Sequence, residues 1–257
     1  MRFEEAAERV QGIPFMESAL ARRVYDHIRE ARPDAVLELG TAHGVSAMYM
    51  AAALEANGRG HLTTVDHGTA AYDPPPERVL GNLSHRVTIV RAHSSYNWWL
   101  MRQIEAASDE HGNCEPAYDF AYLDGAHNFT VDGLAVVLIE KLLRPGGWLL
   151  MDDLDWTYRD NPWFEPQPGA GGNPAPFAPL SDDERDAGQV RAVFEIVVKQ
   201  HPAFSRFVDE DAWYGWAQKN PDAPRRYELA SSRPPLALLL AEIRKRRHAR
   251  RVSAGAG

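Results

Sequence analysis

Apolar side chains follow two alternating patterns between residues 15 and 151. Short, nearly continuous apolar runs are followed by longer segments in which apolar residues recur every three or four positions. Continuous runs are typical of strands buried on both faces of a parallel sheet, and the longer spacing is typical of amphipathic helices. The pattern predicts five buried strands, at residues 35–39, 61–65, 86–90, 120–123 and 148–151.

A helix is predicted before the first strand and after each of the first four. In the first helix Met16, Leu20, Val24 and Ile28 share one face, and Pro33 follows its end. The five helices are expected at residues 15–31, 45–56, 77–83, 97–108 and 131–143. Such alternation requires right-handed crossovers and a parallel sheet covered on both faces, with ligands outside the carboxyl ends of the strands.

The pattern changes after the fifth strand. Residues 160–179 are rich in proline and glycine, which do not sustain regular structure. A helix at 183–200 then precedes two alternating segments, 204–208 and 213–217, joined by a polar turn that is typical of a hairpin. The expected fold is therefore α/β and doubly wound, with a mostly parallel seven-stranded sheet that ends in an antiparallel hairpin.

Length and composition favour one main domain with additions at both ends. A chain of 257 residues fits one α/β domain better than two independent ones. We expect an N-terminal helical cap at residues 1–33 and a main domain at 34–219. A lid-like insertion is expected at 156–181, and a C-terminal extension with a basic helix at 220–257.

Several classes of protein are disfavoured by composition. Hydrophobic residues make up 44% and charged residues 25%, which is typical of a folded globular protein. Cys114 is the single cysteine, so no internal disulfide is possible. The N-terminus has no apolar run typical of a signal peptide, and the longest apolar run, 236–241, is too short to span a membrane. We expect a cytoplasmic protein without a membrane span.

The net charge of -8 conceals a basic tail at residues 244–251, which holds six Lys and Arg. Because the rest of the chain is more acidic still, broad contact with nucleic acid is disfavoured. The tail could contact nucleic acid, an anionic membrane or an acidic neighbour, but a solvated helix end is the simpler interpretation. The oligomeric state is left open, with a homo-oligomer possible.

The loop after the first predicted strand carries the first candidate chemistry. Gly40 and Gly44 lie four residues apart at a strand-to-helix turn, where the backbone can come close to a ligand. The central glycine of the G-x-G-x-x-G loop is absent, which disfavours a nicotinamide-dependent oxidoreductase. Asp66 ends the second strand, where a carboxylate can accept hydrogen bonds from both hydroxyls of a ribose.

Together with Glu38, these residues resemble the class I S-adenosylmethionine-dependent methyltransferases, over roughly residues 15–219. The resemblance implies S-adenosylmethionine as cofactor, with the two glycines near its amino-acid end, Asp66 on the ribose and residues 92–94 beside the adenine. The cofactor-binding residues expected on this basis are Glu38, Gly40, Thr41, Gly44, Asp66, His93, Ser94 and Asp124. The alternative is that the two glycines only permit a tight turn.

Three carboxylates follow the fourth and fifth predicted strands. Asp124 follows the fourth, and Asp152 and Asp153 follow the fifth, so the parallel sheet should bring them together. Their mutual repulsion calls for a cation, and oxygen-only ligation favours Mg²⁺, with Mn²⁺ or Ca²⁺ as substitutes. Such an ion would lower the pKa of a substrate hydroxyl and orient its oxygen. Helix capping or a solvated loop is the alternative for the Asp152-Asp153 pair.

His127 lies three residues after Asp124, where its neutral imidazole could accept the hydroxyl proton. Asp124, His127 and the Asp152-Asp153 pair resemble the metal-dependent sugar O-methyltransferases of macrolide and related antibiotic pathways and, more distantly, catechol O-methyltransferases. That resemblance implies Asp124, Asp152 and Asp153 as metal ligands and His127 as the catalytic base. Asp155 is a departure from the pattern, since it adds a fourth acid.

The expected activity is methylation of a hydroxyl on a small molecule, either a sugar-containing or a polyhydroxylated natural product. Aromatic residues near the strand ends suggest a pocket for a ring-shaped acceptor, or core and subunit contacts for the first two: Trp98, Trp99, Trp156, Tyr158, Trp163 and Phe164. The alternative is a non-catalytic cofactor-binding or interaction protein that uses its basic tail. An RNA methyltransferase is disfavoured by the acidic body and the carboxylates.

Overall fold

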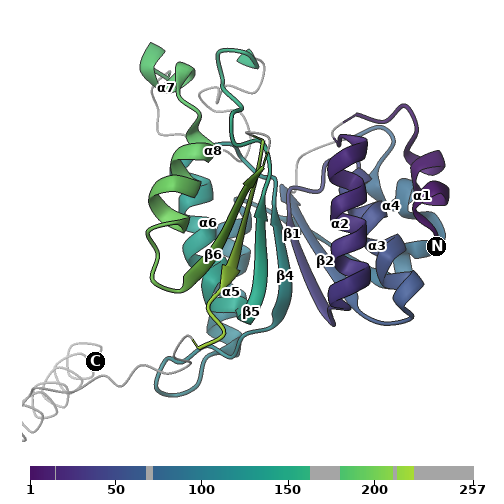
Figure 1. Ribbon diagram of the computed structural model, residues 1–257, viewed down its shortest axis with the longest axis horizontal. Helices are drawn as coiled ribbons and strands as arrows, with labels where there is room; N and C mark the ends of the chain where they lie inside the picture. Colours follow the sequence, from purple (N-terminus) through teal and green to yellow (C-terminus); the bar gives the residue numbers. More distant parts are fainter. Residues whose placement is uncertain (15, 68–71, 163–179, 211–212, 223–257) are drawn as a thin grey trace, which may run out of the picture. The chain divides into compact units, whose positions relative to one another are not determined.

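Seven strands form one mixed sheet in the order β3-β2-β1-β4-β5-β7-β6 (Figure 1). The first five strands are parallel, whereas β7 is antiparallel to both β5 and β6. This confirms the doubly wound α/β fold with its C-terminal hairpin. The strands are β1 Ala35–Leu39, β2 His61–His67, β3 Val87–Ala92, β4 Tyr118–Leu123, β5 Leu143–Met151, β6 Phe204–Glu210 and β7 Tyr214–Lys219.

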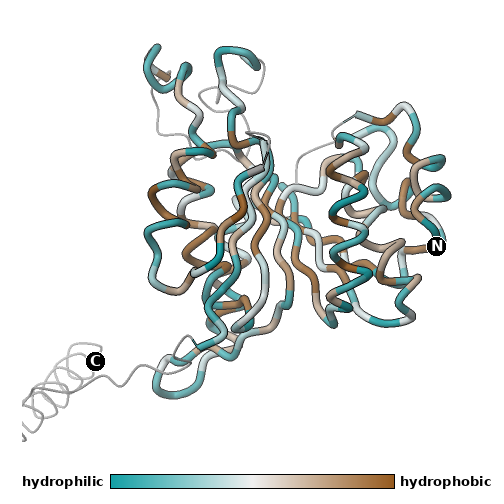
Figure 2. Tube along the Cα trace, viewed as in Figure 1, coloured by the Kyte–Doolittle hydropathy of each residue, from teal (hydrophilic) through white to brown (hydrophobic). Residues whose placement is uncertain are grey.

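Helices cover the two faces of the sheet and create two hydrophobic cores (Figures 1 and 2). One face carries α1 Phe3–Val10, α2 Ser18–Ala31, α3 Val45–Asn57, α4 Pro76–Leu80 and the 3₁₀ helix η1 Gly81–Arg86. The other carries α5 Tyr96–Ala107, α6 Phe129–Leu142, α8 Gln189–Ala192 and the π-helix η3 Val193–Val198. The helix α3 has apolar residues on all sides and is buried almost throughout, as expected for a helix enclosed by neighbours.

The computed structural model describes residues 1–14, 16–67, 72–162, 180–210 and 213–222. The described residues belong to one compact unit. The predicted basic helix and most of the lid-like insertion, including Trp163 and Phe164, therefore lie outside the described residues. No helix in the described ranges combines the length and apolar character needed to cross a membrane.

Two predicted elements differ from the structure. The helix expected at 183–200 is divided into α7 Asp182–Asp186, α8 and η3, because Ala187 and Gly188 leave the helical conformation. Gln189 uses the break to bond the first turn of α6 through the Phe129 N–H, at 2.9 Å. The strand expected at 148–151 begins at Leu143, because residues between Leu143 and Trp148 bulge out of register with β4.

Backbone hydrogen bonds join the loops that leave the carboxyl ends of the strands. The Gly40 N–H donates to Val65 O at 2.9 Å, and the Asp124 N–H donates to Leu39 O at 2.9 Å. The Asp152 N–H donates to Leu123 O at 3.1 Å. The order of successive strands reverses between β1 and β4, since β2 and β3 lie on one side of β1 and β4 and β5 on the other, and doubly wound folds bind ligands at such a switch point.

Candidate active site

The loop between β1 and α3 passes directly against the loop after β4. Gly40 has a φ of +99°, and a Cβ atom there would lie 1.7 Å from the backbone oxygen of Asp124. Gly44 starts α3 with a φ of +82°, and its Cβ would lie 2.9 Å from Pro76. Both glycines are thus required by close approach as well as by backbone conformation.

Asp66, at the end of β2, holds this loop in place. Its Oδ2 accepts from the Thr41 N–H at 3.2 Å and the Ala42 N–H at 2.8 Å, while Oδ1 accepts from the His67 N–H at 2.6 Å. The Thr41 hydroxyl is buried and bonds the Thr64 hydroxyl at 2.6 Å. Asp66 therefore lies where a cofactor-binding residue is predicted, but it also orders the loop itself.

Glu38 lies beneath the same loop and is completely buried. The Ser46 hydroxyl, from α3, donates to Oε1 at 2.5 Å, whereas Oε2 is buried without a hydrogen-bond partner among the described atoms. Burial raises the pKa of this carboxyl to about 8. The site thus contains an acceptor oxygen to which no donor is bonded. His93 and Ser94 follow β3, two strands from β1, and both are exposed.

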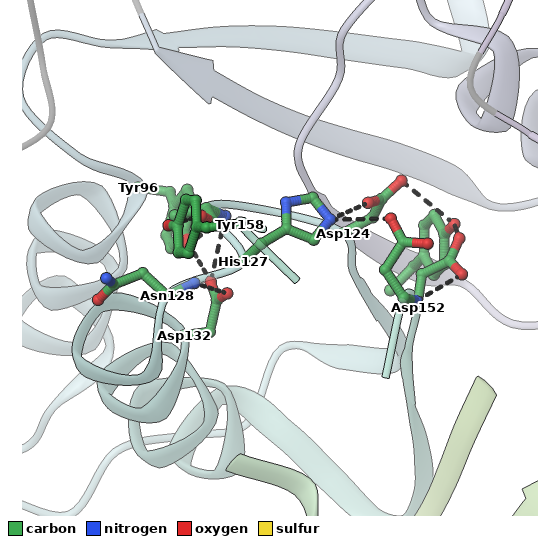
Figure 3. Close-up of polar contacts among 10 residues, drawn as sticks. Tyr96, Asp124, His127, Asn128, Asp132, Asp152 and Tyr158 are labelled. Carbon is green, nitrogen blue, oxygen red and sulfur yellow. Dashed lines mark hydrogen bonds and ion pairs between the residues drawn. The ribbon is translucent and has the colours of Figure 1, made fainter. Parts of the chain in front are cut away.

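Asp124, His127 and Asp153 converge where β4 and β5 end (Figure 3). The His127 Nε2 lies 2.9 Å from Asp153 Oδ2 and 3.5 Å from Asp124 Oδ1. One donor atom from each of the three residues lies within 4.8 Å of the others. His127 and Asp153 have φ values of +54° and +58°, a conformation that is strained for residues other than glycine and recurs at functional sites.

Asp152 lies next to this group without being one of its three members. The Tyr122 hydroxyl donates to Asp152 Oδ2, and the Asp153 N–H donates to Asp152 Oδ1 at 2.8 Å. Tyr122 Oη also lies 3.4 Å from Asp124 Oδ2, so the tyrosine hydroxyl connects Asp124 with Asp152. Asp155 faces a different partner, since Arg191 Nε donates to its Oδ1. Asp155 is therefore engaged away from the group, whereas Asp152 lies beside it with both carboxylate oxygens hydrogen-bonded.

The charges of this group depend on His127. Burial alone would lower the pKa of His127, but its hydrogen bonds and attraction to Asp124 and Asp153 outweigh burial and raise that pKa to about 10. Burial raises the pKa of Asp124, which His127 partly offsets, and burial together with its acidic neighbours raises that of Asp152 well above the usual range. With that pKa, His127 is an imidazolium at neutral pH in the metal-free protein.

Aromatic side chains line the group. Trp156 packs on the His127 ring with centroids 4.6 Å apart, and Tyr158 packs edge-on against Trp156 at 4.7 Å. Both are buried, as expected for the wall of a pocket or for core packing. Trp98, by contrast, is 61% exposed on α5 and takes no part in the wall. Trp99 is half-buried on the same helix and packs against the core of that face.

Sequence reasoning missed Tyr122, Ser46, Tyr96 and Asp132 at this site. The sequence contains a signal for two of them, Tyr122 and Asp132. Tyr122 is a hydroxyl-bearing residue in an otherwise apolar run, and Asp132 is a lone charge among the apolar residues that open α6. Buried polar groups of this kind must be hydrogen-bonded, so each implies a partner nearby.

Comparison with protein families gives a match over the part of the chain that builds this site. Residues 37–154 match the model of a family described as a methyltransferase domain. Over these residues the chain is similar to methyltransferases. The matched residues include the glycine loop, Asp66 and the whole Asp124–His127–Asp153 group. None of the curated proteins compared with the sequence matches it.

Solved structures of methyltransferases share the fold of this chain. The SAH-bound methyltransferase PaMTH1 from Podospora anserina has a TM-score of 0.57 at 15% identity, covering 85% of this chain and 87% of its own. The O-methyltransferase from Bacillus cereus in complex with SAH gives 0.53 at 18%, covering 84% and 88%. TomG, the O-methyltransferase from Streptomyces achromogenes involved in tomaymycin synthesis, solved with SAM, gives 0.53 at 13%, covering 85% and 89%.

Proposed function

We propose that this protein transfers a methyl group from S-adenosylmethionine to a hydroxyl of a small molecule, with the help of a divalent metal ion. The observation that carries the proposal is the position of Asp124. Its backbone oxygen contacts Gly40 of the cofactor loop, while its carboxylate belongs to the Asp124–His127–Asp153 group. Similarity to structures described as O-methyltransferases supports transfer to oxygen. The acceptor class we infer is a sugar-containing or polyhydroxylated natural product.

The buried loop after β1 suits the amino-acid end of S-adenosylmethionine. Glu38 Oε2 is a buried acceptor without a donor, and leaving such an atom unpaired is costly. An ammonium group would supply that donor and favour the ionised carboxylate. Asp66, at the end of the neighbouring strand, is placed to accept from ribose hydroxyls with the lone pairs that the loop amides leave free. His93 and Ser94 remain predicted neighbours of the adenine.

The carboxylates of Asp124 and Asp153 suit a hard divalent cation such as Mg²⁺, with Mn²⁺ or Ca²⁺ as substitutes. When bound, such an ion lowers the pKa of an acceptor hydroxyl and orients its oxygen. His127 is close enough to be a third ligand. The predicted ligand role of Asp152 requires its Oδ2 to exchange the Tyr122 hydroxyl for the cation.

His127 is the proposed proton acceptor. The acceptor hydroxyl gives its proton to His127, its oxygen forms a bond to the methyl carbon, and the bond from that carbon to the sulfonium sulfur breaks. His127 must first be neutral. It loses its own proton more readily when a dication shares Asp124 and Asp153, because two positive charges then compete for the same oxygens. Trp156, stacked on the imidazole, excludes water from one side of the ring.

The test is transfer of labelled methyl from S-adenosylmethionine to a panel of sugars, catechols and polyhydroxylated metabolites, with EDTA or with Mg²⁺. EDTA should abolish transfer and Mg²⁺ should restore it. Asp153→Ala should lower kcat about 100-fold or more while keeping its circular dichroism spectrum and cofactor affinity. Asp155→Ala is the matched control, because that carboxylate pairs with Arg191 and should leave the rate unchanged.

Two results would contradict the proposal in different ways. Full activity in EDTA would exclude the metal-dependent step and leave methyl transfer intact. Tight cofactor binding with no turnover on any hydroxylated acceptor, and no effect of Mg²⁺, would favour the non-catalytic binding protein instead.

A further inference from the structure

The buried carboxylate of Asp132 binds the backbone on both sides of His127, on the side opposite Asp124 and Asp153. Asp132 lies in the first turn of α6 and is 1% exposed. Its Oδ1 accepts from the Ala126 N–H at 3.3 Å, and its Oδ2 accepts from the Asn128 N–H at 3.1 Å. The two donors are the backbone amides on either side of His127. One side chain therefore fixes the chain before and after this residue.

Tyr96 and Tyr158 bind the same stretch of backbone, and together with Asp132 we call them the bracket (Figure 3). Tyr96, from α5, donates its hydroxyl hydrogen to Asp132 Oδ1, and its oxygen lies 3.2 Å from the Ala126 N–H. Tyr158, from the segment after β5, donates to Ala126 O at 3.2 Å. Both peptide groups of the turn at Ala126 are thus held by buried side chains. Gly125 makes room for this, since a Cβ there would lie 2.6 Å from the Tyr96 hydroxyl.

The bracket accounts for the strained conformation of His127. A φ of +54° is unfavourable for a non-glycine residue and persists where its surroundings determine the backbone. The conformation directs the imidazole toward Asp124 and Asp153. A relaxed backbone at this residue would aim the ring elsewhere.

Helix capping does not explain Asp132. The start of α6 is already capped by Asn128, whose side-chain oxygen accepts from the N–H groups of Thr130 and Val131. The Asp132 carboxylate binds instead the N–H of the N-cap residue Asn128 and, before the helix, the N–H of Ala126. We propose that Asp132, oriented by Tyr96, is a positioning residue that holds the imidazole of His127 beside the carboxylates of Asp124 and Asp153. This inference rests on the function proposed above.

The variants Asp132→Asn and Tyr96→Phe test it. Asparagine presents an NH₂ group to one of the donors, so one hydrogen bond of the bracket is lost, whereas phenylalanine removes only the tyrosine hydroxyl. Glu140→Gln is the matched control, because Glu140 is another buried acid of α6 that pairs with Lys219 at the far end of the helix. All are made in the full chain, with melting temperature measured alongside.

Four measurements are compared: the Mn²⁺ dissociation constant, the cofactor dissociation constant, kcat with KM, and hydrogen exchange at the Ala126 and Asn128 amides. In Asp132→Asn the two amides should exchange faster, the Mn²⁺ dissociation constant should rise about tenfold and kcat should fall about tenfold or more, as is typical for residues behind metal ligands. The cofactor dissociation constant should change less than about twofold. Tyr96→Phe should shift the same quantities by less, and Glu140→Gln none of them.

Equal loss of melting temperature in Asp132→Asn and Glu140→Gln, with unchanged Mn²⁺ affinity and kcat in both, would overturn the inference and leave Asp132 with a stabilising role alone. Unchanged exchange of the two amides in Asp132→Asn would also overturn it. If the wild-type protein binds no Mn²⁺, the proposed metal dependence fails instead. The kcat and amide exchange of the variants then still decide the role of Asp132.

Discussion

His127 shares its two carboxylate neighbours with any cation that binds the site. The imidazolium is stabilised by Asp124 and Asp153, the same groups that offer oxygen ligands. Proton and metal therefore compete, and the protonated histidine serves as a counter-charge in the metal-free protein. Metal binding should release a proton for the same reason.

We predict that the His127 imidazole in metal-free protein stays protonated up to a pH of about 10, and that Mg²⁺ lowers its apparent pKa. The measurement is an NMR titration of the imidazole carbon-bound protons, with and without the ion. His127→Gln identifies the resonance. A titration near 6.5, the usual pKa of histidine, without metal would contradict the ion-paired geometry.

The same shift has a consequence for stability, with a defined sign. Because the pKa of His127 in the folded protein lies above the usual histidine pKa of 6.5, protonation of His127 stabilises the folded state fully below pH 6.5 and progressively less toward pH 10. The difference in free energy of unfolding between wild type and His127→Gln should decline across that window.

For individual residues, the sequence predicted which residue types lie at the strand ends but not the orientation of their side chains. Asp124, His127 and Asp153 converge as expected, since register in a parallel sheet aligns strand ends. The orientation of Asp152 depends on the Tyr122 hydroxyl of the neighbouring strand, a contact between residues thirty positions apart. No local pattern contains that information.

Among the elements, α6 and β7 are joined by a buried lysine. Lys219 is the last residue of β7, and its Nζ donates to Glu140 O, to Leu143 O at 2.9 Å and to the Glu140 carboxylate at 2.9 Å. These are acceptors at the C-terminal end of α6, where a positive charge is favourable. The lysine thereby fastens the antiparallel hairpin to the parallel part of the fold.

Lys219→Met should lower the free energy of unfolding by about 3–5 kcal/mol, because it leaves Glu140 and two carbonyl groups buried without their cation. Urea denaturation measures the change. Lys199→Met is the control, since that lysine lies in a more exposed pair with Glu195 and should cost less than about 1 kcal/mol. Similar losses in both variants would contradict the role assigned to burial.

Element predictions succeeded where one periodicity dominates and failed where side chains from other elements intervene. The first strand has the bounds that the apolar run predicts, 35–39. The break in the helix predicted at 183–200 was missed, because it depends on the hydrogen bond of Gln189 to the start of α6. The start of β5 at Leu143 was missed because the residues that follow it form a bulge. Both depend on tertiary contacts.

In the molecule as a whole, the site draws on both hydrophobic cores. Glu38, Tyr122 and Ser46 lie toward the face covered by α2 and α3, whereas Tyr96 and Asp132 belong to helices of the other face. The site therefore depends on both cores being folded. Ligands that bind only the folded state should then stabilise residues 1–222 as one unit.

We predict that S-adenosylmethionine at 100 times its dissociation constant raises the melting temperature by roughly 5–10 °C, the equivalent of about 2.7 kcal/mol for a domain of this size. Mg²⁺ should add a further increase. Differential scanning calorimetry should show the cofactor effect retained and the Mg²⁺ effect lost in Asp153→Ala. A Mg²⁺ effect that survives in this variant would place the ion elsewhere.

The contact between Gly40 and the Asp124 carbonyl limits how this domain can be re-engineered. A loop grafted from a methyltransferase between β1 and α3 must keep glycine at this place, since any side chain would collide with the backbone that carries Asp124. In a chimaera, the loop after β1 and the loop after β4 should therefore be taken from the same protein. Changes meant to alter the range of acceptors are better made after Asp153, in the aromatic wall, where neither loop of the pair is disturbed.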